Sequence, residues 1–188
     1  MLKDYFKESI ALQKQLADDA GIAAAFDAAV GAVAAAFRSG NKVLAAGNGG
    51  SAADAQHFAA EFVGRYKLER KAFPAIALNT DASIITAWSN DYSYDEIFKR
   101  QIEAIGKPGD VLFVFTTSGN SKNILLALEA AKKMGIRTIA FLGRGGGRAR
   151  GMADLEVIIP SENTPRIQEA QKLIYHGIAE EVEKICAE

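Results

Sequence analysis

Residues 47–61 read GNGGSAADAQHFAAE, and this stretch decides the fold of the chain. The largely apolar residues 42–46 before it predict a short strand, and the glycines permit a tight turn into a helix. Ser51 is predicted to cap the N-terminus of that helix. Because the first backbone N–H groups of a helix lack partners and carry partial positive charge, residues 48–51 are predicted to bind a phosphate group.

His57 and Glu61 lie four positions apart in the predicted helix, so both side chains fall on one face. They can form an acid/base pair or supply two metal ligands. The alternative is a surface ion pair, which stabilises a helix by only about 0.2 to 0.5 kcal/mol. The adjacent phosphate loop favours the functional interpretation.

Strands and helices alternate through the rest of the chain. The predicted strands are 42–46, 74–79, 110–116, 136–142 and 154–159, and the predicted helices are 52–65, 121–134 and 165–188, with helical stretches up to about residue 105. The run 111–115 is apolar at every position, which is typical of a strand covered on both faces. The pattern predicts an α/β fold, a three-layer αβα sandwich with a central five-stranded parallel sheet of the flavodoxin type.

Two helices are predicted before the first strand, over residues 2–38, with Gly21 between them and Ser39-Gly40-Asn41 after the second. Residues 20–37 carry one charge, Asp27, and reach the length of a membrane span, about 18 residues. Most of these residues are Ala or Gly, and the larger ones recur at helical spacing, which indicates an amphipathic helix and no membrane partner. Since small side chains let helices approach closely, the two helices are predicted to form an oligomer interface.

The 188 residues fit a single domain, with the two extra helices in residues 1–40 and the α/β core in residues 42–188. Lysine and arginine total 22 against 23 acidic residues, so no overall basic field points to a nucleic-acid partner. Cys186 is the single cysteine, which excludes an intrachain disulfide and favours a reducing compartment. Charged residues near the N-terminus argue against a secretory signal, so a cytoplasmic location is expected.

A second polar loop follows the predicted strand 110–116. The sequence Thr116-Thr117-Ser118-Gly119-Asn120-Ser121 places four hydroxyl groups around one glycine before a helix. Helix capping accounts for Asn120 or Ser121 but not for the whole cluster. Because ligands bind at the carboxyl ends of parallel strands, this loop and residues 48–51 are expected to face one crevice.

Gly47-x-Gly49-x-x-Ala52 also matches a relaxed dinucleotide-binding fingerprint. The acidic residue expected about 20 positions later is matched only by Glu69, in a charged connection, or by Asp81, well beyond it. A nucleotide-dependent dehydrogenase is therefore disfavoured. The glycine-rich segment Gly143–Gly151 carries three arginines that could face an anion, but a solvated surface loop is the favoured interpretation.

The last predicted helix carries Gln168 and His176. They lie eight positions and about 80° apart around the helix axis, which gives them a loose common face. On spacing alone, His176 could equally be a polar residue on the outside of a C-terminal helix.

Several runs together resemble the phosphoheptose isomerases, a family of the sugar isomerase (SIS) domain superfamily. They are residues 47–61, Gly64-Arg65-Tyr66, Pro74-Ala75-Ile76-Ala77-Leu78, Thr117-Ser118-Gly119-Asn120-Ser121 and Arg166-Ile167-Gln168-Glu169. The resemblance implies conversion of sedoheptulose 7-phosphate to D-glycero-D-manno-heptose 7-phosphate through an enediol(ate), the first step of ADP-heptose synthesis for lipopolysaccharide. It also implies a cytoplasmic homotetramer with active sites built between subunits.

The resemblance also implies roles for single positions. Glu61 and His176 would be the catalytic acid/base pair, and a zinc ion, one per subunit, would be held by His57, Glu61, Gln168 and His176. Substrate contacts would come from Asn48, Gly49, Gly50, Ser51, Asn90, Asp91, Thr116, Thr117, Ser118, Ser121 and Gln168. The family commonly has Ser where Thr116 stands, which keeps the hydroxyl, and His where Gln171 stands, which is outside the assigned ligands.

The alternative function is that of a non-catalytic SIS-domain binding protein, of the type that associates with the bacterial replication initiator. That relative lacks the catalytic carboxylate, whereas Glu61 and His176 are both present here. A sugar-phosphate-sensing regulator is a further alternative, but no DNA-binding segment is recognised in the sequence. An isomerase is therefore the favoured function.

Overall fold

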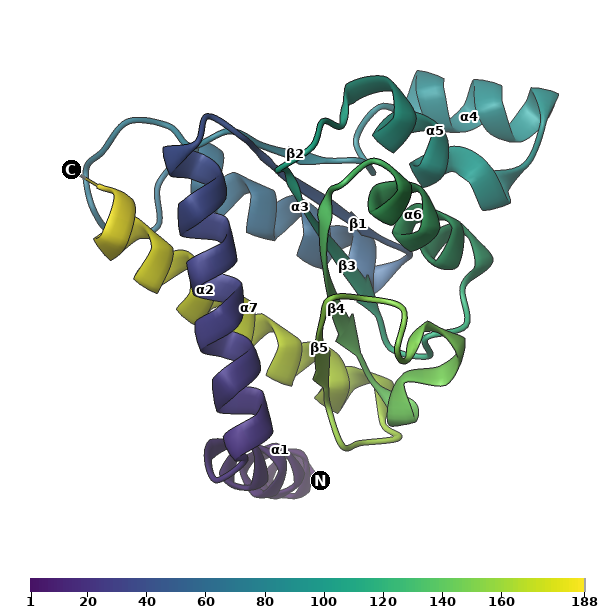
Figure 1. The fold of residues 1–188 in the computed structure, drawn as a ribbon. Coiled ribbons are helices and arrows are strands. Elements are labelled where there is room, and N and C mark those ends of the chain that lie inside the picture. Colours follow the sequence, from purple (N-terminus) through teal and green to yellow (C-terminus); the bar gives the residue numbers. More distant parts are fainter. Residues whose placement is uncertain (188) are drawn as a thin grey trace.

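Five parallel strands form the central sheet of the computed structural model, which describes residues 1–187 (Figure 1). The strands are β1 (Val43–Gly47), β2 (Ala75–Ala77), β3 (Val111–Thr116), β4 (Arg137–Leu142) and β5 (Leu155–Ile158). Their order across the sheet is β2-β1-β3-β4-β5, the flavodoxin-type order. The prediction of a five-stranded parallel sheet of this type is therefore confirmed.

Helices cover both faces of the sheet, which confirms the three-layer arrangement (Figure 1). They are α1 (Leu2–Ala17), α2 (Ala20–Arg38), α3 (Gly50–Val63), α4 (Ala82–Asp91), α5 (Ile97–Ile105), α6 (Lys122–Lys133) and α7 (Thr164–Cys186), with 3₁₀ turns at Tyr94–Glu96 and Arg144–Ala149. Because successive side chains of a strand point to opposite faces, one strand supplies two cores. Phe113 and Phe115 of β3 pack with α2, α3 and α7, whereas Leu112 and Val114 pack with α5 and α6.

The break between the first two helices lies at Asp18–Asp19, so its predicted position at Gly21 is wrong. The Asp19 carboxylate caps α2 by accepting hydrogen bonds from the backbone N–H groups of Gly21 and Ile22, at 2.8 and 3.0 Å. Capping by an acidic side chain therefore outweighs the conformational freedom of glycine in setting this boundary. The predicted end of the second helix is confirmed, since α2 ends at Arg38.

Strand β2 is shorter than the predicted strand 74–79 because it lies at an edge of the sheet and has β1 as its only neighbour. The register pairs Ala75 with Val43 and Ala77 with Ala45. Beyond this point the chain turns, and the Asn79 side chain donates a hydrogen bond to the Gly47 carbonyl at 2.5 Å.

Helix α2 has the length and composition of a membrane span, but it is part of the folded domain. Its residues Val30 and Val33 are buried in the core shared with α3, α7 and the sheet. Helix α1 buries only Leu12 and leaves a row of large apolar side chains exposed: Leu2, Tyr5, Phe6 and Ile10. The oligomer interface predicted for these two helices stays a prediction, and the exposed row is a surface on which it could form.

Strands β1 and β3 are neighbours at the point where the strand order reverses, and ligands of open α/β sheets bind at the carboxyl ends of such strands. The two predicted phosphate loops leave the sheet here, after Gly47 and after Thr116. Their approach is direct, because the side chain of Asn48 is hydrogen-bonded to Asn123, at the start of α6. The two loops therefore leave neighbouring strands at the same edge of the sheet, and a shared crevice stays a prediction.

Candidate active site

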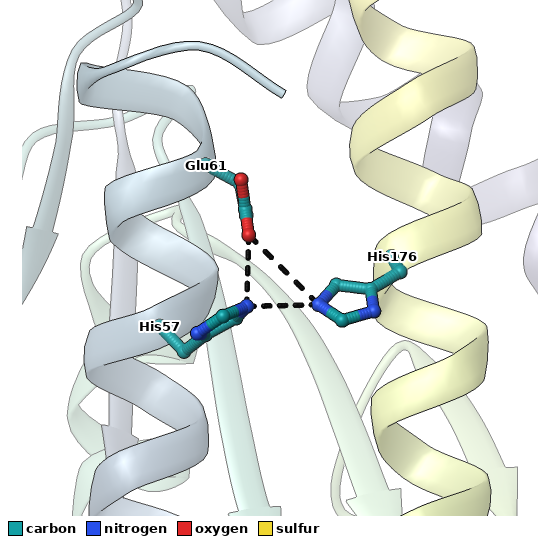
Figure 2. A group of neighbouring side chains, drawn as sticks. All are labelled: His57, Glu61 and His176. Atoms are coloured by element: carbon teal, nitrogen blue, oxygen red, sulfur yellow. Dashed lines mark hydrogen bonds and ion pairs between the residues drawn. The ribbon is translucent and has the colours of Figure 1, made fainter. Parts of the chain in front are cut away.

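His57 and Glu61 of α3 meet His176 of α7 in one cluster (Figure 2). His57 Nε2 lies 2.8 Å from Glu61 Oε1 and 2.8 Å from His176 Nε2, and His176 Nε2 lies 3.8 Å from Glu61 Oε1. The i, i+4 spacing on α3 places the first two side chains together, as predicted. The approach of His176 depends on the packing of α7 against α3.

The cluster is partly open to solvent, with 44% of the His57 side chain, 17% of Glu61 and 29% of His176 exposed. Partial burial and the neighbouring His57 lower the pKa of His176 below its ordinary value, while Glu61 acts in the opposite direction. The neutral form of His176 is therefore favoured, and a neutral imidazole has a lone pair that can accept a proton or bind a metal. A small molecule can reach this group.

Two further residues support the cluster. Asp54 lies one turn before His57 on α3, and Tyr175 directly precedes His176 on α7. The Tyr175 side chain is fully buried, and its hydroxyl donates to Asp54 Oδ1 at 3.3 Å. Burial raises the pKa of both groups. The rings of Phe58 and Tyr175 pack at 5.5 Å between centroids, so this contact joins α3 to α7 on the side that faces the sheet.

The first phosphate loop has the predicted position, but Ser51 does not cap the helix. Helix α3 begins at Gly50, and its N-cap is Gly49, whose φ of 57° favours glycine. The Ser51 side chain, 4% exposed, lies in the first turn. The Gln168 amide lies against Gly50, where an added Cβ would come within 2.5 Å of its nitrogen. The loop is therefore built around the positive φ of Gly49 and the contact of Gly50 with the Gln168 side chain.

Asn48 is held by two residues that the sequence did not single out. Asn48 and Asn123 exchange two amide hydrogen bonds of 2.9 Å, and the Tyr94 hydroxyl donates to Asn48 Oδ1 at 2.9 Å. Tyr94 follows the predicted substrate contacts Asn90 and Asp91, which lie exposed at the end of α4. A polar residue in the first turn of a predicted helix was the only signal for Asn123, and Tyr94 had none.

The second phosphate loop is shaped by its own side chains. Thr116 Oγ1 accepts a hydrogen bond from the Gly119 N–H at 3.2 Å, and Ser118 Oγ accepts one from Asn120 N–H at 3.2 Å. Ser121 stands at the N-cap of α6 without a side-chain capping bond. Capping therefore does not account for this hydroxyl, and the Thr117 hydroxyl has no hydrogen bond to another described residue.

Part of the segment Gly143–Gly151 packs on this loop, while its three arginines, Arg144, Arg148 and Arg150, are exposed, as the surface-loop interpretation expects. Gly146 and Ala149 are buried, and Ala149 N–H donates to the Gly119 carbonyl at 2.9 Å. Arg148 N–H donates to Asn120 Oδ1 at 3.1 Å. These contacts follow from glycines with positive φ, which let the two backbones approach closely.

Two glutamines of α7 have different surroundings. Gln168 lies beside the first phosphate loop, while the cluster of His57, Glu61 and His176 lies about two turns further along both helices. Gln171 is fully buried, and neither atom of its amide finds a hydrogen-bond partner within residues 1–187. The structure thus places the Gln168 side chain beside the predicted substrate contacts of the first loop and not in the cluster of His57, Glu61 and His176.

Comparison with known proteins gives the same result at the level of family. The SIS domain family matches residues 4–143. The phosphoheptose isomerase of Citrifermentans bemidjiense is 53% identical over 97% of this chain and 92% of its own length, and that of Clostridium acetobutylicum is 51% identical over 95% and 91%. The solved structure of the phosphoheptose isomerase from Francisella tularensis superposes with a TM-score of 0.92 at 37% identity, over 97% of this chain and 96% of that one.

The chain belongs to the phosphoheptose isomerase family of SIS domain proteins. The resemblance drawn from the sequence is confirmed, and with it an isomerase of carbohydrate metabolism. The alternative of a non-catalytic binding protein is not favoured, because the relatives that are 51 and 53% identical over nearly the whole chain are named phosphoheptose isomerases. Within this family, the cluster of His57, Glu61 and His176 is the candidate for the chemistry.

Proposed function

We propose that this chain converts sedoheptulose 7-phosphate to D-glycero-D-manno-heptose 7-phosphate, the first step of ADP-heptose synthesis for lipopolysaccharide. The observation that carries the proposal is the meeting of Glu61 from α3 with His176 from α7, close to two loops suited to a phosphate group. The names of the relatives, at 51 to 53% identity, support the same substrate.

The reaction moves protons between neighbouring atoms of the substrate. A proton leaves carbon 1, an enediol(ate) forms across carbons 1 and 2, and a proton is added to carbon 2, while the oxygen on carbon 1 loses its proton and the oxygen on carbon 2 gains one. Glu61 supplies a carboxylate for these transfers, and His176 supplies an imidazole whose lowered pKa favours the neutral form. A positioned acid or base typically contributes about 10² to 10⁴-fold to the rate.

The phosphate loops hold the substrate for this step. Backbone N–H groups of residues 48–51 and hydroxyls of the second loop suit the phosphate. Asn90, Asp91 and Gln168 complete the substrate contacts. The full proposed set is Asn48, Gly49, Gly50, Ser51, Asn90, Asp91, Thr116, Thr117, Ser118, Ser121 and Gln168. Binding energy from a remote phosphate would orient the reacting carbons beside Glu61 and His176.

A zinc ion fits the donor set of the cluster. Two imidazole nitrogens and a carboxylate oxygen lie within 4.8 Å of one another, and zinc accepts N and O donors with an open position at catalytic sites. We propose His57, Glu61 and His176 as ligands and Gln168 as a fourth, which requires its amide to turn away from Gly50. Bound zinc would act as a Lewis acid toward the substrate's oxygens.

Replacing either member of the acid/base pair tests the proposed activity. Glu61→Gln and His176→Gln are each expected to lower kcat for sedoheptulose 7-phosphate by at least about 10²-fold without unfolding the protein, because the acid/base transfer is lost. Gln56→Ala, at an exposed neighbouring position on α3, is the control and should keep its activity. Rates like those of the unchanged protein in either variant would contradict the assignment.

Metal analysis of the purified protein tests the zinc proposal. About one zinc ion per chain is expected, because the proposed ligands form a single cluster. Activity should fall after chelation and return with added zinc. Retained isomerase activity of Gln168→Ala in chelator-treated buffer would count against a zinc requirement.

We further propose a cytoplasmic homotetramer with active sites between subunits, in keeping with the exposed apolar row on α1.

A further inference from the structure

The connection between α3 and β2 is fastened to α7 by a buried ion pair. Arg70 Nε lies 2.9 Å from Glu183 Oε1, and each side chain is 1% exposed. Breaking such a pair is costly, but replacing it with apolar side chains is often neutral or stabilising. Stability alone therefore gives no reason for a buried pair at this place, and the contacts of each partner point to a different role.

The Glu183 carboxylate holds the backbone of the connection. It accepts hydrogen bonds from three successive N–H groups, those of Tyr66, Lys67 and Leu68, at 2.8 to 2.9 Å. Together with the Arg70 guanidinium, these donors satisfy the buried carboxylate. Residues 66–68 are therefore fixed to the last turns of α7.

The Arg70 guanidinium holds the end of α3. Its Nη2 donates to the Glu61 carbonyl at 2.8 Å, and its Nη1 donates to the Phe62 carbonyl at 2.9 Å. The last carbonyls of a helix lack partners within the helix and favour a nearby cation. The backbone of Glu61 is thereby joined, through Arg70 and Glu183, to the helix that carries His176.

This link bears on the cluster because its members come from two helices (Figure 2). Tyr175 joins α7 to α3 on the sheet side of the cluster, at Asp54. On the other side, beyond Glu61, the ion pair makes the connection, and it also holds Tyr66, whose ring lies 5.7 Å from that of His176. The separation between Glu61 and His176 is thus set from both sides.

We propose that Arg70 and Glu183 are positioning residues, which fix the Glu61 carboxylate relative to the His176 imidazole. The inference rests on the acid/base roles proposed above for these two residues. A misplacement of about 1 Å in a catalytic group can cost about 10²-fold in rate. The phosphate loops leave the sheet at the other end of α3, so substrate binding should be little affected.

Two conservative variants test the role. Arg70→Lys keeps the charge but loses the forked donors to the Glu61 and Phe62 carbonyls, and Glu183→Gln keeps the shape but loses the charge. Each is expected to lower kcat about 10- to 100-fold with KM within about twofold, measured well below the melting temperature of each variant. Glu180→Gln is the control, because Glu180 pairs with Lys67 of the same connection at the surface, and its kcat should not change.

A kcat equal to that of the unchanged protein in folded Arg70→Lys would overturn the inference, even if the melting temperature fell. A rise in KM without a fall in kcat would overturn it too. If Glu183→Gln does not fold, Arg70→Lys decides. The proposed function has a separate test: if Glu61→Gln were active, the acid/base role itself would be wrong. The two failures can therefore be told apart.

Discussion

At the scale of single residues, the candidate site depends on side chains that hold other side chains. Asn48 is the first polar residue after β1, and both of its amide atoms are used by Asn123, with Tyr94 adding a third hydrogen bond. An asparagine held in this way enters substrate binding with little freedom left to lose. Tyr94 and Asn123 are therefore expected to act on affinity rather than on the chemical step.

Tyr94→Phe tests this expectation. Removal of the hydroxyl deletes one hydrogen bond to Asn48, worth about 0.5 to 1.5 kcal/mol, so KM should rise about 2- to 10-fold with kcat nearly constant. Tyr92→Phe is the matched control, since this exposed tyrosine stacks on Trp88 and its hydroxyl has no hydrogen-bond partner in the described part of the chain. Equal KM values for the two variants would show that Tyr94 does not position Asn48.

At the scale of elements, two irregular segments fix each other. The segment Gly143–Gly151 packs on the loop after β3, and a methyl group on Gly119 would overlap the Gly146 carbonyl. Both glycines have positive φ, which other residues adopt only with strain. The second phosphate loop therefore keeps its shape through a contact that lies far along the sequence.

Gly119→Ala should displace this loop and raise KM more than about tenfold, because several phosphate contacts shift together. Gly145→Ala is the control: its φ of 70° is equally unfavourable for alanine, at about 1 to 2 kcal/mol, but nothing lies within 4 Å of an added Cβ. Michaelis constants from both variants, with melting temperatures, separate loss of the contact from backbone strain. Similar KM values would contradict the role of the contact.

The helix α7 also carries a titratable anchor. Although burial acts to raise it, three backbone N–H donors and Arg70 bring the pKa of Glu183 below its ordinary value. A lowered pKa contributes stability above the ordinary pKa of glutamate, about 4.3, and this stability is lost as the pH falls through the folded-state pKa. Glu183 therefore contributes to stability at neutral pH and to unfolding in acid.

Glu183→Gln is expected to lower the melting temperature at pH 7 and to reduce its fall between pH 7 and pH 3, since one proton-linked contribution is removed. Melting curves at fixed protein concentration measure both effects. Asp154→Asn provides a comparison. Although burial acts to raise it, backbone and side-chain hydrogen bonds from Thr138 lower the pKa of Asp154. Removing this carboxylate should therefore also reduce the fall of the melting temperature between pH 7 and pH 3. If the melting temperature of Glu183→Gln fell as much between pH 7 and pH 3 as that of the unchanged protein, Glu183 would not be the titrating group.

At the scale of the whole molecule, helix α1 presents apolar residues that the rest of the described chain, residues 1–187, leaves largely exposed. Leu2, Phe6 and Ile10 are 51 to 69% exposed and recur every four positions, so they share one face. Contiguous exposed apolar side chains mark interaction surfaces. Self-association through this face accords with the proposed tetramer.

Phe6→Glu should reduce the mass of the assembly measured by light scattering after size-exclusion chromatography, because burying an unpaired carboxylate is costly. Ala11→Glu adds the same charge at an exposed position away from the apolar row and should leave the mass unchanged. If sites lie between subunits, activity should fall with the mass in Phe6→Glu alone. An unchanged mass would exclude this face as the interface.

The sequence by itself determined the layers of the fold and half of the candidate site. Strand periodicity, glycine turns and the i, i+4 pair of His57 and Glu61 are local features, set by backbone geometry and by neighbours within a turn. The sequence did not show which of two neighbouring residues sets a helix boundary. Asp19, and not Gly21, determines where α2 starts, and Gly49, and not Ser51, is the N-cap of α3.

Only the tertiary structure decided which distant residues meet. His176 is 119 positions from His57, and its approach follows from the packing of α7 against α3, which no spacing rule contains. The same holds for Asn123 and Tyr94 around Asn48, and for Arg70 with Glu183. Side-chain contacts between elements depend on the summed packing of both cores, so they appear only when the whole chain is folded.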